Sequence, residues 1–394
     1  MRSTRIVITL FFFADGLLLG SWASRIPAVQ ARAGLTNTSL GLALFASSLG
    51  ALLAMPIAGR LCERIGSNRV SVAALVLAGG GLVAASSASG FVGVALGLLA
   101  FGGGFGSINV AANTQGIALE GLYGRTILST FHAAFSIGAM AGAAGGALAA
   151  RMNISPAAHI GVLALVVAGW AVLLGPTLLP TERAVATPPR ALLRPPRALL
   201  VLGAAAFCTL LAEGSAADWS ATYLTQSLAA AAAIAGFGYA TFSLAMASSR
   251  ILGDRLARRL GPVTLARAGA ALAACGLSVA LVAGWTPLAL AGFGAMGAGL
   301  GVVVPVLFRA AGSAPGISTS VGVAAVSSVG WLGFLAGPPA IGLLAGVVGL
   351  RAALGIVVLA IVSLVFLVSA AAPRPAQTLS GQQQEPTVRE KVWA

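Results

Sequence analysis

The stretch GRLCERIGSNR at residues 59–69 is a short polar connection between two long apolar segments, and it decides the fold. The segments on either side, residues 37–59 and 70–89, have the length at which a helix crosses the hydrocarbon core of a bilayer, roughly 20 residues. Gly59 and Gly66 permit a tight turn between them. The stretch therefore predicts two membrane-spanning helices joined by a compact, arginine-rich loop.

The composition of the whole chain agrees with this reading. Hydrophobic residues make up 58% of the chain and charged residues only 8%, and the mean hydropathy is +0.97, which is too apolar for an ordinary soluble domain. Backbone amides in lipid must be paired internally, and long runs rich in Gly, Ala, Leu and Val suit helices better than alternating barrel strands. The sequence predicts an all-α membrane protein.

Windows of spanning length, broken at charged, proline or polar clusters, predict twelve transmembrane helices. The expected spans are 5–29, 37–59, 70–89, 91–119, 126–150, 156–180, 198–226, 229–252, 262–284, 286–311, 316–346 and 349–371. The polar, proline-containing segment 181–197 is expected to be a cytoplasmic linker between an N-terminal six-helix bundle, 1–180, and a C-terminal one, 198–372. The polar tail 373–394 is predicted to be disordered and cytoplasmic.

Weak internal repeats indicate that the two bundles are related. The tripeptide at 14–16, Ala-Asp-Gly, returns as Ala-Glu-Gly at 212–214, an offset of 198 from residue 15 to residue 213. Two further matches, 64–66 with 259–261 and 101–102 with 293–294, have offsets of 195 (64 to 259) and 192 (101 to 293). Three matches in order at nearly one offset predict two pseudo-symmetric halves with a site between them.

The stretch 59–69 and its echo GDRLARRLG at 253–261 resemble the signature loop of the major facilitator superfamily. The segments SWASRIP at 21–27 and AEGSAADWS at 212–220 are similar to the bacterial MosC/YbjJ-like branch of that superfamily. The resemblance implies a fold of two six-helix halves and transport by alternating access. Two residues depart from the pattern: Glu63 replaces the usual aspartate of the loop, and Asn109 stands where this branch is expected to have an acid.

The net charge of +14 is explained by topology. No Lys/Arg cluster is interleaved with aromatic residues, so nucleic acid is not an expected partner. Arginines gather on one side of the predicted bundle, and cytoplasmic loops accumulate positive charge, so both termini are expected in the cytoplasm of a bacterial inner-membrane protein. The residues on that side are Arg2, Arg5, Arg60, Arg64, Arg69, Arg125, the arginines of 183–197 and of 250–267, and Arg309.

The cysteines and histidines have no spacing typical of a metal site. Cys62, Cys208 and Cys275 are isolated. We therefore expect no metal, no cofactor and no enzymatic activity, and the partners expected are the lipid bilayer, protons and a small solute, bound by a monomer.

Two acids near the middle of predicted helices are the leading candidates for proton coupling: Asp15 and Glu213. A charged side chain at that depth costs about 2.5–3.5 kcal/mol, which usually marks a functional group. Burial favours the protonated form of a carboxyl, which suits it to proton exchange, although a packing role would also be consistent. Asp218 and His132 are further candidates, and His132 can equally be structural.

Polar and aromatic residues in four predicted helices are candidates for solute binding. They are Trp22, Arg25, Asn109, Asn113, Gln115, Trp219 and Tyr223. Arg25 is expected to hold an anionic solute, to pair with Asp218, or to anchor at the interface. The asparagines favour a hydroxylated solute or a contact between helices, and Trp219 with Tyr223 predicts an aromatic wall or an interfacial anchor.

The two arginine-rich loops are predicted to gate the cytoplasmic side. The candidate residues are Gly59, Glu63, Arg64, Gly66, Arg69, Gly253, Asp254, Arg255 and Arg258. Their acids are positioned to pair with arginines or with a facing helix N-terminus, and so to latch that side. Positive-inside topology alone would explain the arginines, but it explains neither the acids nor the glycines.

These observations together predict a secondary active transporter that moves a small polar or amphipathic solute by alternating access, coupled to protons. A sugar-like solute, an organic acid or a drug-like molecule all fit the predicted residues. The first alternative is an exporter of drugs or metabolites that works by proton antiport. The second is a membrane sensor or scaffold that transports nothing, which would not need paired acids inside the membrane.

Overall fold

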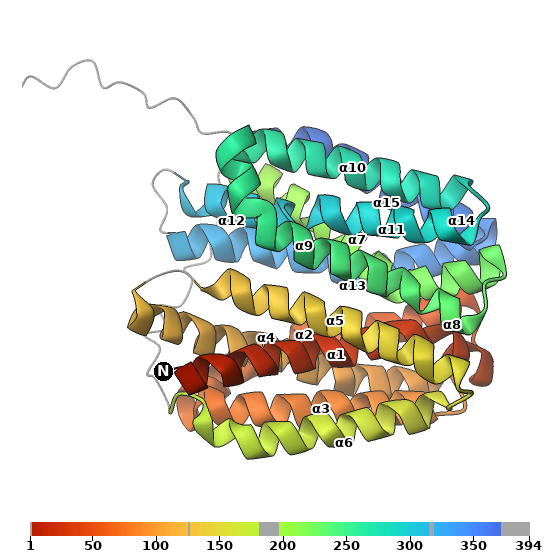
Figure 1. Cartoon of the computed structure of the whole chain (residues 1–394), viewed down its shortest axis with the longest axis horizontal. Helices are drawn as coiled ribbons and strands as arrows, with labels where there is room; N and C mark the ends of the chain where they lie inside the picture. The colour runs from red at the N-terminus through yellow and green to blue at the C-terminus, as the bar shows by residue number, and fades with distance from the viewer. Residues whose placement is uncertain (1, 125–126, 181–196, 315–318, 372–394) are drawn as a thin grey trace, which may run out of the picture.

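The computed structural model describes residues 2–124, 127–180, 197–314 and 319–371, and within these ranges the chain is helical, with no strand. The helices run side by side along the long axis of the molecule (Figure 1). The first half contains α1 (Arg2–Arg32), α2 (Asn37–Ile65), α3 (Ser67–Ser87), α4 (Phe91–Tyr123), α5 (Leu128–Arg151), α6 (Pro156–Leu174) and the 3-10 turn η1 (Gly175–Thr177).

The second half begins after the undescribed residues 181–196, and several of its spans are divided. It contains α7 (Arg197–Leu228), α8 (Ala232–Ala235), α9 (Phe237–Leu260), α10 (Pro262–Val282), α11 (Thr286–Leu300), α12 (Val303–Gly312), α13 (Thr319–Val348), α14 (Leu350–Ala353), α15 (Gly355–Leu367) and η2 (Val368–Ala371). Eleven of the described helical segments are long and apolar enough to cross a membrane, with α11 and α12 counted as one segment and α14 and α15 as another. The predicted all-helical, multi-pass membrane protein is thereby confirmed. The remaining expected span, 229–252, corresponds to α9, which does not reach that apolarity.

The pattern of helix packing is the same in both halves. In the first half α1 packs on α5, α2 and α3 pack on α4, and α3 packs on α6. The equivalent pairs in the second half are α7 with α13, α9 and α10 with α11, and α10 with α15. Across the interface α2 packs on α13 and α5 packs on α9, again an equivalent pair. This is the pseudo-symmetry that the sequence repeats predicted, although the residue boundaries expected for the two bundles remain predictions.

The contact between α1 and α5 shows why so many glycines are needed. A Cβ atom added to Gly16 on α1 would lie 2.0 Å from the carbonyl oxygen of Phe135 on α5. A Cβ on Gly138 of α5 would lie 2.1 Å from the carbonyl oxygen of Phe13. Backbones in contact at this distance leave no room for a side chain, and such packing replaces the missing hydrophobic driving force between helices in lipid.

The two arginine-rich connections are shorter than predicted. The helix α2 continues to Ile65, so Gly59, Glu63 and Arg64 lie in its last turns, and Gly66 alone, with φ 97°, leads into α3. Gly261, with φ 80°, makes the same turn between α9 and α10. The predicted helix ends at 59 and 252 were wrong because a hydropathy window ends where charge begins, whereas a helix backbone keeps its hydrogen bonds beyond the hydrocarbon layer. The positive φ explains why glycine occupies both turns.

Candidate functional site

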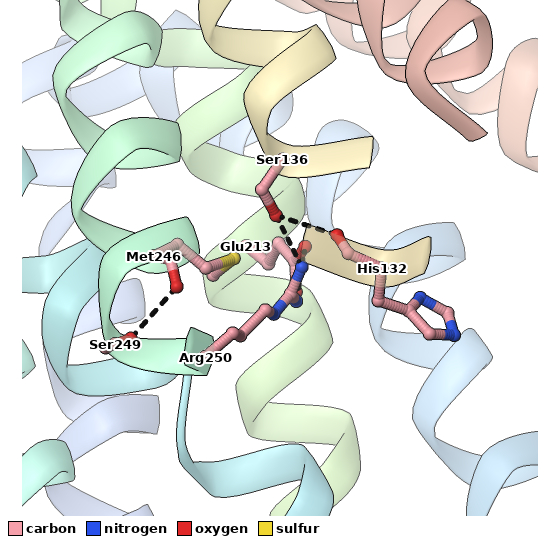
Figure 2. A network of polar contacts seen from close by, with 6 residues as sticks. All are labelled: His132, Ser136, Glu213, Met246, Ser249 and Arg250. Carbon is pink, nitrogen blue, oxygen red and sulfur yellow. Dashed lines mark hydrogen bonds and ion pairs between the residues drawn. The ribbon is translucent and has the colours of Figure 1, made fainter. Parts of the chain in front are cut away.

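A charged pair lies between α7 and α9 in the second half. Nη2 of Arg250 is 3.5 Å from Oε1 of Glu213, and Figure 2 shows the two side chains directed toward each other. Their side chains are only 15% and 13% exposed, so the pair is largely withdrawn from the surface. An ion pair at this depth is stable only while both partners stay charged, because a lone charge would be left in a poorly solvating environment.

Arg250 also reaches across to the first half. Its Nη1 donates a hydrogen bond of 2.7 Å to Oγ of Ser136 on α5, and that hydroxyl donates to the carbonyl oxygen of His132 at 3.3 Å (Figure 2). Ser136 is buried. We call Glu213, Arg250 and Ser136 the central cluster. One guanidinium group therefore connects Glu213 to the other half of the bundle.

The central cluster contains two residues that the sequence reasoning missed. Arg250 was grouped with the cytoplasmic arginines because α9 was expected to end at 252, but α9 ends at Leu260. Arg250 thus lies ten residues before the end of its helix, a rise of roughly 15 Å. The sequence repeat that matches 64–66 with 259–261 could have located this helix end, because it places the glycine of the turn at 261 rather than near 252.

The acid of the first half has a different environment. Asp15 on α1 is 5% exposed, and its buried Oδ1 has no hydrogen-bond partner. The equivalent acid of the second half, Glu213, is paired with Arg250 instead. Asp218, one and a half turns after Glu213 on α7, is half-buried. Within the described ranges neither Asp15 nor Asp218 forms an ion pair. The two leading candidates for proton coupling, Asp15 and Glu213, therefore have different environments in this conformation.

His132 lies beside the central cluster but does not point into it. Figure 2 shows its imidazole turned away from Arg250. The ring packs edge-on against Phe12 of α1, with the centroids 5.4 Å apart and the planes at 68°. Its link to Ser136 is made by its backbone carbonyl. A histidine held in this way is positioned for packing between α1 and α5 in this conformation.

The aromatic candidates are buried. Trp22 is 2% exposed, and Trp219 and Tyr223 are not exposed at all. The hydroxyl of Tyr223 donates to the carbonyl oxygen of Ala280 on α10 at 2.8 Å, and also interacts with Arg351. The predicted aromatic wall from Trp219 and Tyr223 is thus divided: Tyr223 ties α7 to α10 within the second half, while the indole N–H of Trp219 has no partner.

Arg25 forms no ion pair with Asp218 in this conformation. It is 4% exposed, and it donates to the carbonyl oxygens of Gly146, at 3.2 Å, and Ile154. These carbonyls belong to the last turns of α5 and the loop beyond it. The C-terminal end of a helix carries partial negative charge, which attracts a guanidinium group. Its Nε atom remains buried without a partner.

The polar residues of α4 have local partners. The side chain of Asn113 donates to the carbonyl oxygen of Asn109 at 2.7 Å, and Asn109 is half-buried. Gln115 donates to Oγ of Ser67 at 2.7 Å and to the carbonyl oxygen of Leu179 at 3.0 Å, and it accepts from the Leu179 N–H. Gln115 therefore joins α4 to the start of α3 and to the chain after α6.

The predicted gating residues lie at one end of the bundle, which we call the arginine-rich end; the opposite end is the arginine-poor end. Glu63, Arg64, Arg69, Arg255 and Arg258 are exposed there, and Glu63 forms no ion pair within the described part of the chain. Gly66 turns the backbone between α2 and α3. Gly253 lies within α9, and a Cβ atom added to it would lie 3.5 Å from a methyl carbon of Val302. The side chain of Asp254 lies outside the described part of the structure. The proposed latches are not closed in this conformation at Glu63.

Comparisons with known proteins place this geometry in a family. The family model described as the major facilitator superfamily matches residues 6–321. An uncharacterised MFS-type transporter of Yersinia pestis is 34% identical, over 91% of this chain and 93% of that protein. The membrane protein MosC of Rhizobium meliloti is 32% identical, over 90% of this chain and 86% of that protein.

Solved structures agree at the level of fold. A bacterial homologue of the human lysosomal transporter Spinster, in an inward-facing and occupied conformation, superimposes with a TM-score of 0.74. The match covers 93% of this chain and 95% of that chain, at 13% sequence identity, so it shows the fold alone. The matched family model and the relatives in two other bacteria show that the chain belongs to the major facilitator superfamily of membrane transporters.

Proposed function

We propose that this chain is a secondary active transporter that moves a small polar or amphipathic solute across a bacterial inner membrane by alternating access, coupled to protons. The observation that carries the proposal is the central cluster: a glutamate inside the membrane, paired with an arginine that is also bonded to the other half. A membrane protein without transport would have no need of an exchangeable charge at the interface between its halves.

The proposed coupling step follows from the charge balance of the pair. While Glu213 is ionised, it and Arg250 together carry no net charge. A proton on Glu213 leaves the pair with one positive charge, and the ion pair is lost. An uncompensated guanidinium in a dry interface is costly, so Arg250 must find another anion or the interface must rearrange. Either result links proton binding at Glu213 to the state of the α5–α9 contact.

The same balance favours one class of solute among the three that the sequence leaves open. A carboxylate or other anion bound beside Arg250 would replace the charge that Glu213 loses on protonation. An organic acid therefore fits the central cluster better than a neutral sugar or a cationic drug. Asp15, buried with an unpartnered oxygen, is proposed as a second group for protons or solute in the first half. Glu63 and the arginines near it are proposed to latch the arginine-rich end in the opposite conformation.

The orientation proposed is that the arginine-rich end faces the cytoplasm, since positive charge is retained there. In a variant lacking Cys62, Cys208 and Cys275, a single cysteine at Thr187 is expected to resist an impermeant thiol reagent added to intact cells. The same cysteine should react after the membrane is permeabilised. Reaction in intact cells would reverse the proposed orientation.

The proposed activity is tested by uptake into proteoliposomes under an imposed pH gradient. Panels of organic acids, sugars and amphipathic cations are compared, with proton movement followed by an internal pH dye. We expect at least one organic acid to move uphill with a matching proton flux, and its direction relative to the protons distinguishes symport from the antiport alternative. Movement of no solute and no protons from any panel would contradict the proposal and favour a sensor or scaffold.

A further inference from the structure

Three amide side chains close a ring between the two halves at the arginine-poor end. Nε2 of Gln30 on α1 donates to Oδ1 of Asn37 on α2 at 2.9 Å. Nδ2 of Asn37 donates to Oε1 of Gln226 on α7 at 3.1 Å. Nε2 of Gln226 completes the circuit by donating to Oε1 of Gln30 at 3.1 Å. Within the ring each amide gives one hydrogen bond and accepts one, so the ring is complete only when all three are present. Nε2 of Gln30 also donates to the carbonyl oxygen of Leu35 at 3.2 Å.

The ring lies next to a close backbone contact between α2 and α13. A Cβ added to Gly41 would lie 2.6 Å from the carbonyl oxygen of Pro338, and one added to Gly342 would lie 2.8 Å from the carbonyl oxygen of Asn37. Thr38 donates to the carbonyl oxygen of Gly342 at 3.3 Å. Asn37, one of the three residues of the ring, thus also takes part in this backbone contact. The two halves are therefore in direct contact at the arginine-poor end.

We propose that Gln30, Asn37 and Gln226 form the gate that closes the arginine-poor end of the transport pathway. This inference rests on the proposed alternating access, but not on proton coupling. Opening of that end separates α7 from α1 and α2, and so breaks the two hydrogen bonds of Gln226. Because the three amides carry no charge, the strength of the gate does not change with pH. Proton binding then acts at the acids elsewhere in the bundle, while the ring sets how readily the arginine-poor end opens.

Ser48 is a suitable reporter of opening. Its hydroxyl donates to the carbonyl oxygen of Phe334 on α13 at 2.9 Å, so it also lies between the halves. It is eleven residues after Asn37 on α2, roughly 16 Å deeper in the bundle. A cysteine there has nearly the size of serine. We expect an impermeant thiol reagent added at the arginine-poor side to reach it more readily when the ring is broken.

The test measures the labelling rate of Ser48→Cys in a background without the native cysteines. Gln226→Ala removes both bonds between the halves, and we expect labelling about tenfold faster, as the loss of two amide hydrogen bonds implies. Asn37→Ala removes only one of these two bonds, so its labelling should be faster than in the wild type but slower than in Gln226→Ala. Ser39→Ala is the matched control, because Ser39 bonds only to Thr36 within its own half and should leave the rate unchanged. The expected increase should be the same at acid and neutral pH.

A second variant keeps the test decisive if the alanine variants fold poorly. In Gln226→Glu, a protonated carboxyl can donate to Gln30 and restore the ring, whereas an ionised carboxylate cannot. Labelling of Ser48→Cys should then become pH-dependent, slow in acid and fast at neutral pH. Unchanged labelling in all three variants, with the cysteine reactive in denatured protein, would overturn the gate. Failure of proton coupling would instead appear as pH-independent uptake and would leave these labelling rates as expected.

Discussion

Glutamine in place of Glu213 is expected to abolish uphill transport driven by a pH gradient while sparing downhill exchange of the same solute. Glutamine keeps the shape and much of the hydrogen bonding of a protonated glutamic acid, but it cannot release a proton. A gradient of about one pH unit is worth a factor of about ten in accumulation for each coupled proton. Wild-type protein should approach such a ratio in proteoliposomes, and the variant should stop at equal concentrations on both sides.

Two comparisons identify the cause of that loss. Glu120→Gln is the matched control, because Glu120 accepts from the backbone N–H groups of Ile127 and Leu128 at the start of α5 and lies outside the central cluster. Its uphill transport should match the wild type. Asp15→Asn tests the acid of the other half, and a larger loss of solute binding there would assign recognition to α1 and coupling to α7. If Glu213→Gln reached the wild-type ratio, Glu213 would not be the coupling group.

Methionine in place of Arg250 is expected to reduce both stability and coupling. The substitution removes the partner of Glu213 and the hydrogen bond to Ser136, leaving a carboxylate without compensation between the halves. Breaking a buried pair from one side costs about 3–5 kcal/mol, and the slight exposure of both side chains places this pair near the lower end of that range. We expect a melting temperature several degrees lower in detergent, and no uphill transport.

The double variant Glu213→Gln with Arg250→Met separates these two effects. No lone charge remains in it, so its melting temperature should return close to that of the wild type. Its uphill transport should remain absent, since neither the proton-binding group nor its partner is present. A single Arg250→Met variant with wild-type stability and full uphill transport would show that the ion pair has no role in coupling.

The all-helical, two-halved membrane fold could be predicted from sequence because composition and the length of apolar runs are properties of whole segments. The lengths of individual helices could not be predicted as well. Residues 60–65 are charged enough to end a hydropathy window, yet they continue α2, because water solvates their side chains without disturbing the helical hydrogen bonds. The end of α9 was predicted too early for the same reason, and Arg250 was therefore assigned to the surface instead of to the interior of the bundle.

Individual site residues were harder to assign because a residue type and its spacing do not specify a partner. Tyr223 has the spacing of a ligand wall with Trp219, but its hydroxyl meets carbonyl groups of α10 that no sequence pattern indicates. Gln30 and Gln226 are 196 residues apart and lie near the ends of their helices, where polar residues are ordinary. Only the packing of the two halves brings them together with Asn37. The acids were recognisable because a carboxyl inside a membrane is costly wherever it lies.

The most direct test of the central claim is whether Glu213 exchanges a proton in the folded, membrane-embedded protein. Infrared difference spectra of proteoliposomes, taken between alkaline and acid buffer, report the C=O stretching band of any carboxyl that becomes protonated. We predict a band on acidification in the wild type that is absent in Glu213→Gln and present in the Glu120→Gln control. Identical bands in the wild type and in Glu213→Gln would contradict proton exchange at Glu213.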